Sequence, residues 1–592
     1  MLKLLRYLRK QDYLIALISV GFIVLQVWLD LLMPDYTANL TEEIASGAPT
    51  LNAVWRNGGF MLLCALGSVA SSMICSFFVA RIATGYATTL RAEMFDKVLT
   101  FSDKEINEFT TPSLITRTTN DIIQIRMLIV MGLQVFIKAP ILAIWAICKM
   151  SVSSVEWTVA TAIAVAVIAV MVAILVILCF PRFKVIQQLT DRLNNVTREN
   201  VSGVRVIRAF NAEDYQAKKF EDVNTQVVKN HLFTARTMGI MMPVMTMCMS
   251  GLTLAIYWIA AILMNGVAIT PTNFEVALME RVSIFGNAAA FMQYAMQVVM
   301  AFMSLIMVFI MLPRCLVSAK RINAVLDTEP SVRDGSGEDV SNSATAEHKI
   351  EFRNVAFSYE GGENTVSDIS FTVEKGQTVA FIGATGSGKT TLVKLLERNY
   401  DVTGGAIFVD GVDVRNYREN DLREKISLAP QKAVLFKGDI RSNVTYGMSG
   451  DVDETRLQNA LEVAQASEFV NGLEKGVESE VAQGGTNFSG GQKQRLSIAR
   501  AVYKNADIMI FDDTFSALDY KTDMLVRRKI KEKCSGATVL IIAQRIGTIM
   551  NADKIIVLDE GRIVGEGTHK ELMLSCTVYQ NIALSQLNKE EL

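Results

Sequence analysis

The chain has 592 residues, of which 51% are apolar and 20% are charged, and its formal net charge is −2. A charge this close to zero gives no global electrostatic support for a nucleic-acid partner, so we expect none. The eight cysteines show no CxxC or Cys/His spacing, which argues against a structural zinc site and against a disulfide framework.

Long apolar runs are concentrated in the first 320 residues. Crossing a bilayer as a helix takes about 20 residues. Six runs meet this length, at about 14–33, 59–80, 127–148, 157–180, 240–263 and 284–312. The alternative, six buried helices of a soluble protein, would need a very large apolar core. We therefore predict a membrane all-α domain of six transmembrane helices at residues 1–320.

Basic residues predict the orientation of these spans, because cytoplasmic loops are enriched in Lys and Arg. Loops 81–126 and 181–239 carry six and ten of them, respectively. The connections on the other side carry only Arg56, Lys149 and Arg281. We expect a multi-pass protein of the cell membrane with both long loops and both termini in the cytoplasm. Each loop should end in a short helix, near Asp103–Thr111 and Ala209–Tyr215, unless it is a plain solvated loop.

Polar and methionine side chains within the spans are candidates for a substrate path. Gln134 and Lys138 are spaced i, i+4 on the third span, as are Gln293 and Gln297 on the last. A mid-span lysine is costly, so it either faces a cavity or pairs with an acid such as Asp30. Six methionines share one helical face of the last span: Met292, Met296, Met300, Met303, Met307 and Met311. They suit promiscuous apolar binding, but helix packing is the favoured explanation for most of them.

Residues 321–348 are polar and rich in Ser, Gly and acids, which indicates a linker. Residues 349–592 are typical of a soluble α/β domain, expected in the cytoplasm. Within it, TVAFIGATGSGKTTLVKLLER (378–398) has the pattern of a strand, a glycine loop and a helix. Such a loop curls backbone N–H groups around phosphates, a lysine reaches the β/γ-phosphates, and a hydroxyl binds Mg²⁺. The expected nucleotide-binding residues are Gly383, Ala384, Thr385, Gly386, Ser387, Gly388, Lys389, Thr390 and Thr391.

Other motifs accompany the phosphate loop. FSGGQ places Ser489, Gly490, Gly491 and Gln492 at the start of a helix, which is a second anion site. One nucleotide needs only one phosphate cradle, so the second implies another nucleotide, held between two subunits. Three more residues complete the pattern: Tyr359, which can stack on adenine; Gln431, which can sense a γ-phosphate or Mg²⁺; and Asp512, which ends an apolar strand.

Taken in order, these motifs resemble those of ATP-binding cassette (ABC) transporters, and the six spans ahead of them resemble the half-transporter exporters. The resemblance implies a P-loop nucleotide-binding domain that uses ATP and Mg²⁺, with the metal at Thr390, Gln431 and Asp512. It also implies a head-to-tail pair of chains, each ATP lying between one phosphate loop and the other chain's signature, SGGQ. Closure around ATP would then switch a membrane cavity from inward- to outward-facing.

Two residues depart from the family pattern at the hydrolytic centre. Asp513 stands where the family has the glutamate that polarises water, which withdraws the carboxylate by about 1 Å and can cost ~10²-fold in rate. Gln544 stands where the family has a histidine, and it cannot carry a charge. Together they resemble the degenerate half of heterodimeric bacterial multidrug exporters. We therefore expect a different half-transporter as partner, and a small hydrophobic or amphipathic substrate from the lipid bilayer.

Three alternatives remain open from the sequence. A homodimer could work slowly with Asp513 and Gln544. The cargo could be a lipid or a peptide moved by the same machinery. The chain could also be a regulatory ATP-binding membrane subunit, although a regulator would not need six spans.

Overall fold

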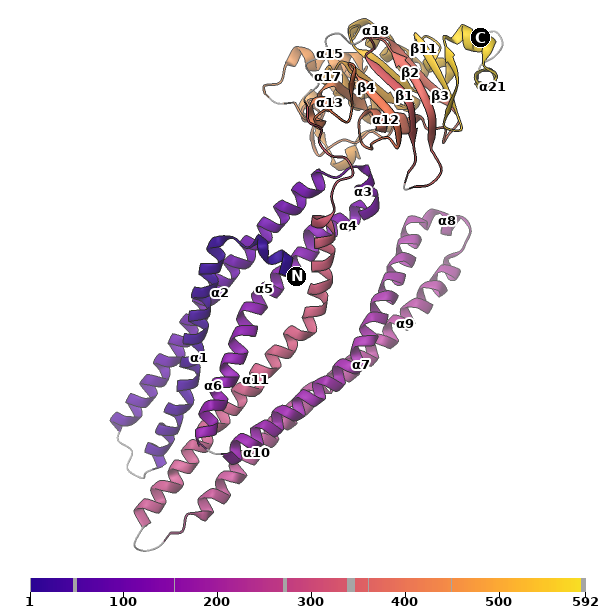
Figure 1. The fold of residues 1–592 in the computed structure, drawn as a ribbon. Helices are drawn as coiled ribbons and strands as arrows, with labels where there is room; N and C mark the ends of the chain where they lie inside the picture. Colours follow the sequence, from indigo (N-terminus) through magenta and orange to yellow (C-terminus); the bar gives the residue numbers. More distant parts are fainter. Residues whose placement is uncertain are drawn as a thin grey trace. The chain divides into compact units, whose positions relative to one another are not determined.

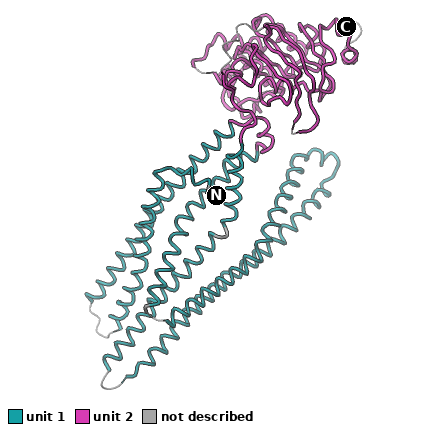
Figure 2. Tube along the Cα trace, in the orientation of Figure 1, with its two compact units in different colours: residues 1–99, 112–328 teal, residues 100–111, 329–592 magenta. Residues whose placement is uncertain are grey.

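The structure, a computed structural model, describes residues 2–45, 51–153, 155–269, 274–337, 347–359, 361–448 and 450–586 of the 592. The chain divides into two compact units (Figure 2). Unit 1 comprises residues 1–99 and 112–328, and unit 2 comprises residues 100–111 and 329–592. Part of the predicted linker, residues 338–346, lies outside the described residues.

Unit 1 is built from helices (Figure 1). The long ones are α1 (Lys10–Ala45), α2 (Leu51–Leu99), α5 (Ile122–Met131), α6 (Ile137–Ser153), α7 (Val155–Ser202), α9 (Glu213–Gly239), α10 (Met241–Gly266) and α11 (Phe274–Asp327). Shorter turns are η1 (Leu2–Tyr7), α4 (Thr111–Thr116), η2 (Arg117–Asp121), η3 (Gly132–Phe136) and α8 (Val204–Ala209). In the described part of the chain, six helical segments are long and apolar enough to span a membrane, which confirms the prediction of six spans.

These helices continue well beyond a bilayer, as expected for the two long loops. α7 has 48 residues, whereas about 20 cross the hydrocarbon core. Predicted short helix Asp103–Thr111 is found as α3 (Asp103–Phe109), capped by Ser102. The prediction near Ala209–Tyr215 was wrong, because the short helix α8 comes earlier. α7 ends at Ser202, just before Gly203, and Asn211 with φ +50° turns the chain into α9.

Packing within unit 1 joins helices that are distant in sequence. α1, α2, α6 and α11 share a core that includes Val27, Val79 and Ala146, all fully buried. The ring of Trp157 on α7 packs 5.2 Å from that of Phe291 on α11, centroid to centroid. Figure 1 shows α7 and α9 side by side as the arms of a hairpin that α8 closes.

Unit 2 contains two main sheets. The four-stranded antiparallel sheet has the order β2-β1-β4-β5, and the six-stranded sheet has the order β12-β11-β3-β10-β9-β6. The strands are β1 (Ile350–Phe357), β2 (Val366–Val373), β3 (Thr378–Gly383), β4 (Gly404–Val409), β5 (Val412–Asp413), β6 (Ile426–Ala429), β9 (Ile508–Asp512), β10 (Thr538–Ile542), β11 (Lys554–Asp559) and β12 (Arg562–Gly567), with a small pair of β7 (Gly438–Asp439) and β8 (Glu480–Val481). Strands β6, β9, β10, β3 and β11 run parallel, and β12 is antiparallel to β11.

The helices of unit 2 flank these sheets. They are α3, α12 (Lys389–Leu396), α13 (Glu419–Lys425), α14 (Ile440–Val444), α15 (Glu454–Val463), α16 (Ser467–Asn471), α17 (Gly490–Lys504), α18 (Tyr520–Lys533), α19 (Ile546–Ile549), α20 (His569–Ser575) and α21 (Thr577–Gln586), with 3-10 turns η5 (Gly476–Glu478), η6 (Gln483–Gly485) and η7 (Thr514–Ala517). The predicted α/β domain is confirmed.

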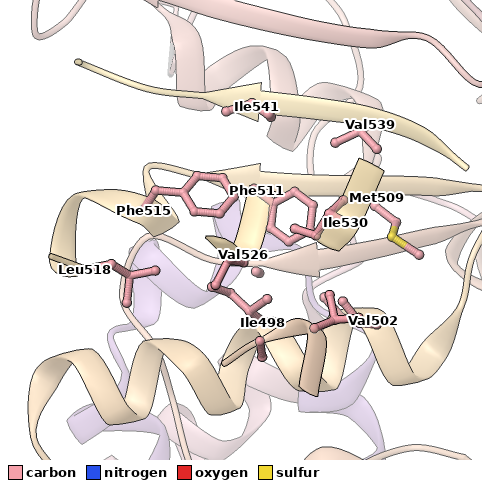
Figure 3. Packing of buried hydrophobic residues seen from close by; sticks show 14 of the residues in the cluster. Ile498, Val502, Met509, Phe511, Phe515, Leu518, Val526, Ile530, Val539 and Ile541 are labelled. Atoms are coloured by element: carbon pink, nitrogen blue, oxygen red, sulfur yellow. The ribbon is translucent and has the colours of Figure 1, made fainter. Parts of the chain in front are cut away.

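The apolar core of unit 2 fixes the strand that carries the acids. Every residue of β9 and β10 is buried, as expected for parallel strands covered on both faces. Figure 3 shows Phe511 of β9 beside Phe515, with ring centroids 5.4 Å apart. Helix α17 contributes Ile498 and Val502 to this core, and α18 contributes Val526 and Ile530. The ends of β9, α17 and α18 are therefore held by one packed cluster.

A buried lysine ties the two sheets together, which generates a prediction. Lys349, just before β1, is 6% exposed and pairs with Asp410 at 2.8 Å and with Asp507 at 2.9 Å. Lys349→Met should lower the melting temperature of unit 2 by roughly 5 °C, because it removes the cation of Asp507, whose side chain is 63% exposed, and one of the two cations of Asp410, which also pairs with Lys425. Differential scanning fluorimetry of the purified full chain measures this.

The control is Arg333→Ala, which breaks the exposed pair of Arg333 with Glu329. An exposed pair contributes about 0–1 kcal/mol, so this variant should melt like the parent. A Lys349→Met shift as small as that of the control would show that the buried pairs do not stabilise the unit.

Candidate functional site

The phosphate loop joins the end of β3 to the start of α12. Gly386 and Gly388 have φ of +88° and +96°, a region that favours glycine. A Cβ at Gly388 would lie 2.5 Å from Cγ1 of Val366, and one at Gly383 would lie 2.0 Å from the carbonyl oxygen of Leu558. The glycine spacing read from the sequence is therefore a steric requirement of this loop.

Lys389, the first residue of α12, points its ammonium group back along the loop. Its Nζ donates to the carbonyl oxygens of Gly383 and Ala384 at 2.8 Å each, and to Oγ of Ser387 at 3.2 Å. Burial lowers the pKa of Lys389, and the nearby carboxylates of Asp513 and Asp512 oppose this effect. The loop, the N-terminus of α12 and this cation form a site suited to phosphate.

Oxygen ligands suited to a divalent cation lie beside the loop. The hydroxyl of Thr390 donates to Oδ1 of Asp512 at 3.3 Å, and Asp512 is 6% exposed. Burial raises the pKa of Asp512; the Asp513 carboxylate adds to this, whereas the Thr390 hydrogen bond opposes it. A hydroxyl and a carboxylate side by side fit Mg²⁺, which prefers oxygen ligands.

Asp513 is held by two glutamines. Its Oδ2 accepts hydrogen bonds from Nε2 of Gln544 at 3.0 Å and from Nε2 of Gln431 at 3.3 Å. Its backbone has φ +45°, a left-handed conformation that Asp adopts more readily than most residues. The structure thus brings together three of the predicted residues, which come from the ends of the neighbouring strands β6, β9 and β10.

Histidines are engaged elsewhere. His348 contacts Glu374 at 2.7 Å, and His569 contacts the hydroxyl of Tyr579 at 2.7 Å. His231 belongs to α9 in unit 1. In the part of the chain that the structure describes, no histidine takes the place of Gln544 beside Asp513.

Tyr359 and helix α3 line one end of the nucleotide region. The ring of Tyr359 is 38% exposed and packs edge-on against Phe357 and Tyr400, and its hydroxyl lies 3.2 Å from Oγ1 of Thr391. A cavity of about 660 Å³ includes these rings and Asn107 of α3. Asp103 of α3 also pairs with Lys394 of α12 at 2.6 Å, so α3 contacts the helix that begins at the phosphate loop.

The signature residues lie at the exposed start of α17. Ser489 caps the helix by accepting from the backbone N–H of Gln492, whose side chain accepts from the backbone N–H of Ser489. Among the described residues, each of these side chains bonds to the backbone N–H of the other residue and not to the phosphate loop. Phe488, which precedes the motif, is buried and packs against Phe469, with centroids 6.4 Å apart, so it fills the core without changing the exposed motif.

Comparison with known proteins identifies the family. Residues 366–516 match the ABC transporter family, and residues 15–287 match the ABC transporter transmembrane region. An uncharacterised ABC transporter ATP-binding protein of Mycobacterium tuberculosis is 36% identical, covering 99% of this chain and 98% of its own length. The chain belongs to the ABC transporter family.

Other relatives agree. An uncharacterised ABC transporter ATP-binding protein of Bacillus subtilis is 31% identical over 100% of this chain and 99% of its own. An ATP-dependent lipid A-core flippase of Bordetella avium is 32% identical over 93% of each chain. The fold is that of a bacterial Atm1-family ABC exporter solved with ATP bound, with a TM-score of 0.76, 22% identity, and 97% and 98% of the two chains covered. This ABC half-transporter is thus a multi-pass membrane protein with an ATP-hydrolysing domain.

A residue that no sequence motif marks holds the switch loop of this ABC transporter, the segment 543–545 that joins β10 to α19 and carries Gln544. Gln586, in α21, accepts from the backbone N–H of Ile546 at 2.8 Å and donates to the carbonyl oxygen of Gln544 at 2.7 Å. Gln586 therefore holds the loop at two points, Gln544 and Ile546, and the side chain of Gln544 reaches Asp513. No local motif marks it, since 42 residues separate it from Gln544.

These two contacts predict that Gln586→Ala loosens the switch loop. Losing a hydrogen bond of about 1 kcal/mol should speed amide exchange about 5-fold. Hydrogen–deuterium exchange of a peptide covering 541–550 measures it, and a peptide covering 426–431 should not change. The matched control is Gln580→Ala on the same helix, because Gln580 donates instead to the carbonyl of Met573. Equal exchange in both variants would exclude this role of Gln586.

Proposed function

We propose that this chain exports hydrophobic or amphipathic compounds of the multidrug type, by ATP-driven alternating access, as one half of a heterodimer. Its own ATP site hydrolyses poorly, and most turnover occurs at the partner's site. One observation carries this proposal: a single oxygen of Asp513 accepts hydrogen bonds from both Gln431 and Gln544.

The chemistry of that contact argues against general-base catalysis. A base must reach and accept a proton from water. An oxygen that already accepts hydrogen bonds from other donors is less available to that water. Here one oxygen of Asp513 already has two amide donors, and its side chain is one methylene shorter than the family glutamate. The amide of Gln544 is neutral and directed to Asp513, so it does not supply the charge of a protonated histidine.

The remaining site residues receive the roles that the family implies. Residues 383–391, which include Lys389, would hold the phosphates. Tyr359 would stack on adenine. Mg²⁺ would be held by Thr390 and Asp512, with Gln431 near it, and when bound it neutralises phosphate charge. Ser489, Gly490, Gly491 and Gln492 would complete the partner's ATP site, which the exposure of Ser489 and Gly490 at the start of α17 supports.

Exposed apolar side chains support a two-chain assembly. At the tip of the α7–α9 hairpin, Val206, Phe210 and Tyr215 are 61%, 79% and 70% exposed. Apolar groups clustered at the end of a long hairpin suit packing against another chain.

We further propose that the transmembrane domain spans residues 1–320, the linker 321–348 and the nucleotide-binding domain 349–592. This domain and both termini would be cytoplasmic, on the basic side of the spans.

An apolar cavity supports apolar cargo. It measures about 450 Å³ and lies between α7, α9–α10 and α11, lined by side chains such as Ile168, Val172, Met241 and Phe302. A second candidate, lipid export, is favoured by the 32% identity with a lipid A-core flippase. Transport assays in vesicles against a panel of compounds and lipids would separate the two.

The heterodimer predicts that the chain expressed alone has little ATPase activity. Co-expression with a half-transporter that has Glu and His at these two positions should restore it, because the signature of this chain completes the partner's site. The measurement is ATP hydrolysis by the purified single chain and by the pair. Robust cooperative hydrolysis by the single chain would instead establish a working homodimer.

The two departures should act as a unit, which predicts non-additive rescue. Asp513→Glu returns the carboxylate to water but keeps the neutral Gln544, and Gln544→His leaves a short acid. The double variant should raise single-turnover hydrolysis beyond the product of the single effects, in a heterodimer whose partner glutamate has been removed.

Asp513→Asn is the control for this experiment. It keeps the size of the side chain and should change hydrolysis little, because Asp513 is not proposed to act as a base. A large loss in this control, or a double variant as inert as the parent, would contradict the proposed cause of the weak site.

A further inference from the structure

A polar cavity of about 500 Å³ lies within unit 1, between α1, α2, the η3–α6 segment and α11. Asp30, Lys138, Gln134 and Gln297 line it, together with apolar side chains such as Met33 and Met300. Gln293, the fourth predicted substrate-path residue, does not line it. Ionisable and amide groups within membrane spans are costly, so their convergence on one cavity points to a ligand.

Of the two charged side chains in this cavity, Lys138 is more accessible to a ligand than Asp30. Oδ2 of Asp30 pairs with Nζ of Lys138 at 3.3 Å, and Oδ1 accepts from the hydroxyl of Ser68 at 2.5 Å. Each carboxylate oxygen therefore has one hydrogen-bond partner. An ammonium group has three donors, of which Asp30 takes one. The side chain of Lys138 is 33% exposed, whereas that of Asp30 is 18% exposed. The cavity thus presents a cation with spare donors, which favours an anionic oxygen.

The amide side chains of the cavity instead favour a ligand that carries hydrogen-bond donors. Nε2 of Gln297 donates to the carbonyl oxygen of Asp30 at 3.2 Å, while its Oε1 is buried and has no hydrogen-bond partner among the described residues. An unpaired buried acceptor is unfavourable until a donor reaches it. Gln134 directs its amide to Ser76 at 3.1 Å, which orients its side chain. A fitting ligand therefore carries N–H or O–H donors as well as an anionic oxygen.

The local backbone supports a functional role for this wall. Residues Gly132–Phe136 form a π-helical turn, η3, which includes Gln134 and ends just before the residues Ile137 and Lys138. Such turns are frequent at functional sites. Pro140, which cannot donate a backbone hydrogen bond, follows within α6.

We propose that this cavity binds the polar head of an amphiphile that combines an anionic oxygen, phosphate or carboxylate, with N–H or O–H donors. The apolar part of the ligand lies against Met33 and Met300. The inference rests on the proposed transport function and specifies its substrate class. It disfavours simple cationic amphiphiles, since the only acid that lines the cavity among the described residues is bonded through both oxygens and is less exposed than Lys138.

The experiment measures binding of lysophosphatidylethanolamine to the full transporter, with its partner, in nanodiscs. Lys138→Met should weaken binding roughly 10- to 100-fold, because it removes a charge-assisted hydrogen bond. Binding of a neutral monoacylglycerol should change little. The double variant Asp30→Asn/Lys138→Met should show the same loss, and it avoids an unpaired carboxylate that could impair folding.

Lys149→Met is the matched control. Lys149 pairs with Asp35 on the same two helices, α6 and α1, but neither residue lines the cavity. Its binding should equal that of the parent. A similar loss in Lys149→Met, or tighter binding of dodecyltrimethylammonium than of the phospholipid, would overturn the proposal.

Two further measurements separate the possibilities. Glycerophosphoethanolamine has the head group without the tail, so it identifies where the ligand comes from. If it binds, the ligand can be a soluble compound. If only the lysophospholipid binds, the ligand is a lipid. ATP-driven transport is measured separately: Lys138-dependent binding without transport contradicts the export function alone. Transport and ATPase stimulation that do not depend on Lys138 contradict the head-group site alone.

Discussion

The parallel register of the six-stranded sheet is the constraint on which the nucleotide region depends. Strands β3, β10, β9 and β6 end at the same edge, with Ile542 paired to Asp512 and Ala429 paired to Phe511. The phosphate loop, the acids and the two glutamine loops follow directly from those ends. Because β9 and β10 are wholly buried, the apolar core holds these loops in place. The positions of the polar site residues are thus set by the pairing of buried apolar strands.

The structure shows two acids whose settings differ in one decisive respect. Asp513 is bound by two neutral amides through one oxygen, which occupies that oxygen without neutralising the charge of the carboxylate. Asp30 is bound by the ammonium group of Lys138 and the hydroxyl of Ser68, and this ammonium group has more hydrogen-bond donors than Asp30 uses. The first arrangement underlies the proposal of weak hydrolysis at this site. The second favours recognition of a polar group in an apolar setting.

Features encoded by neighbouring residues were predictable, and those made by distant residues were not. The phosphate loop is local, since its glycines, Lys389 and Thr390 lie within one short stretch, and the structure explains each glycine by sterics. The six spans followed from long apolar runs. The ion pair of Lys138 with Asp30 was left open, because composition does not say which helix faces are neighbours. Gln586 could not be found, because its role arises only when α21 folds back onto the switch loop. The second hairpin tip was misplaced because Gly203 and Asn211 set its turns.

The π-helical turn Gly132–Phe136 also bears on how this transporter can diverge. A π turn holds about one residue more than an α turn, and each helical residue turns the chain by roughly 100°. Deleting one residue there would restore a regular helix, and because the extra residue only widens that turn, the residues on either side would keep nearly the same faces. The same deletion in a regular part of the helix would instead rotate everything beyond it by about 100°. The chain can therefore lose a residue at this turn and reshape the wall beside Gln134 while Lys138 stays next to Asp30.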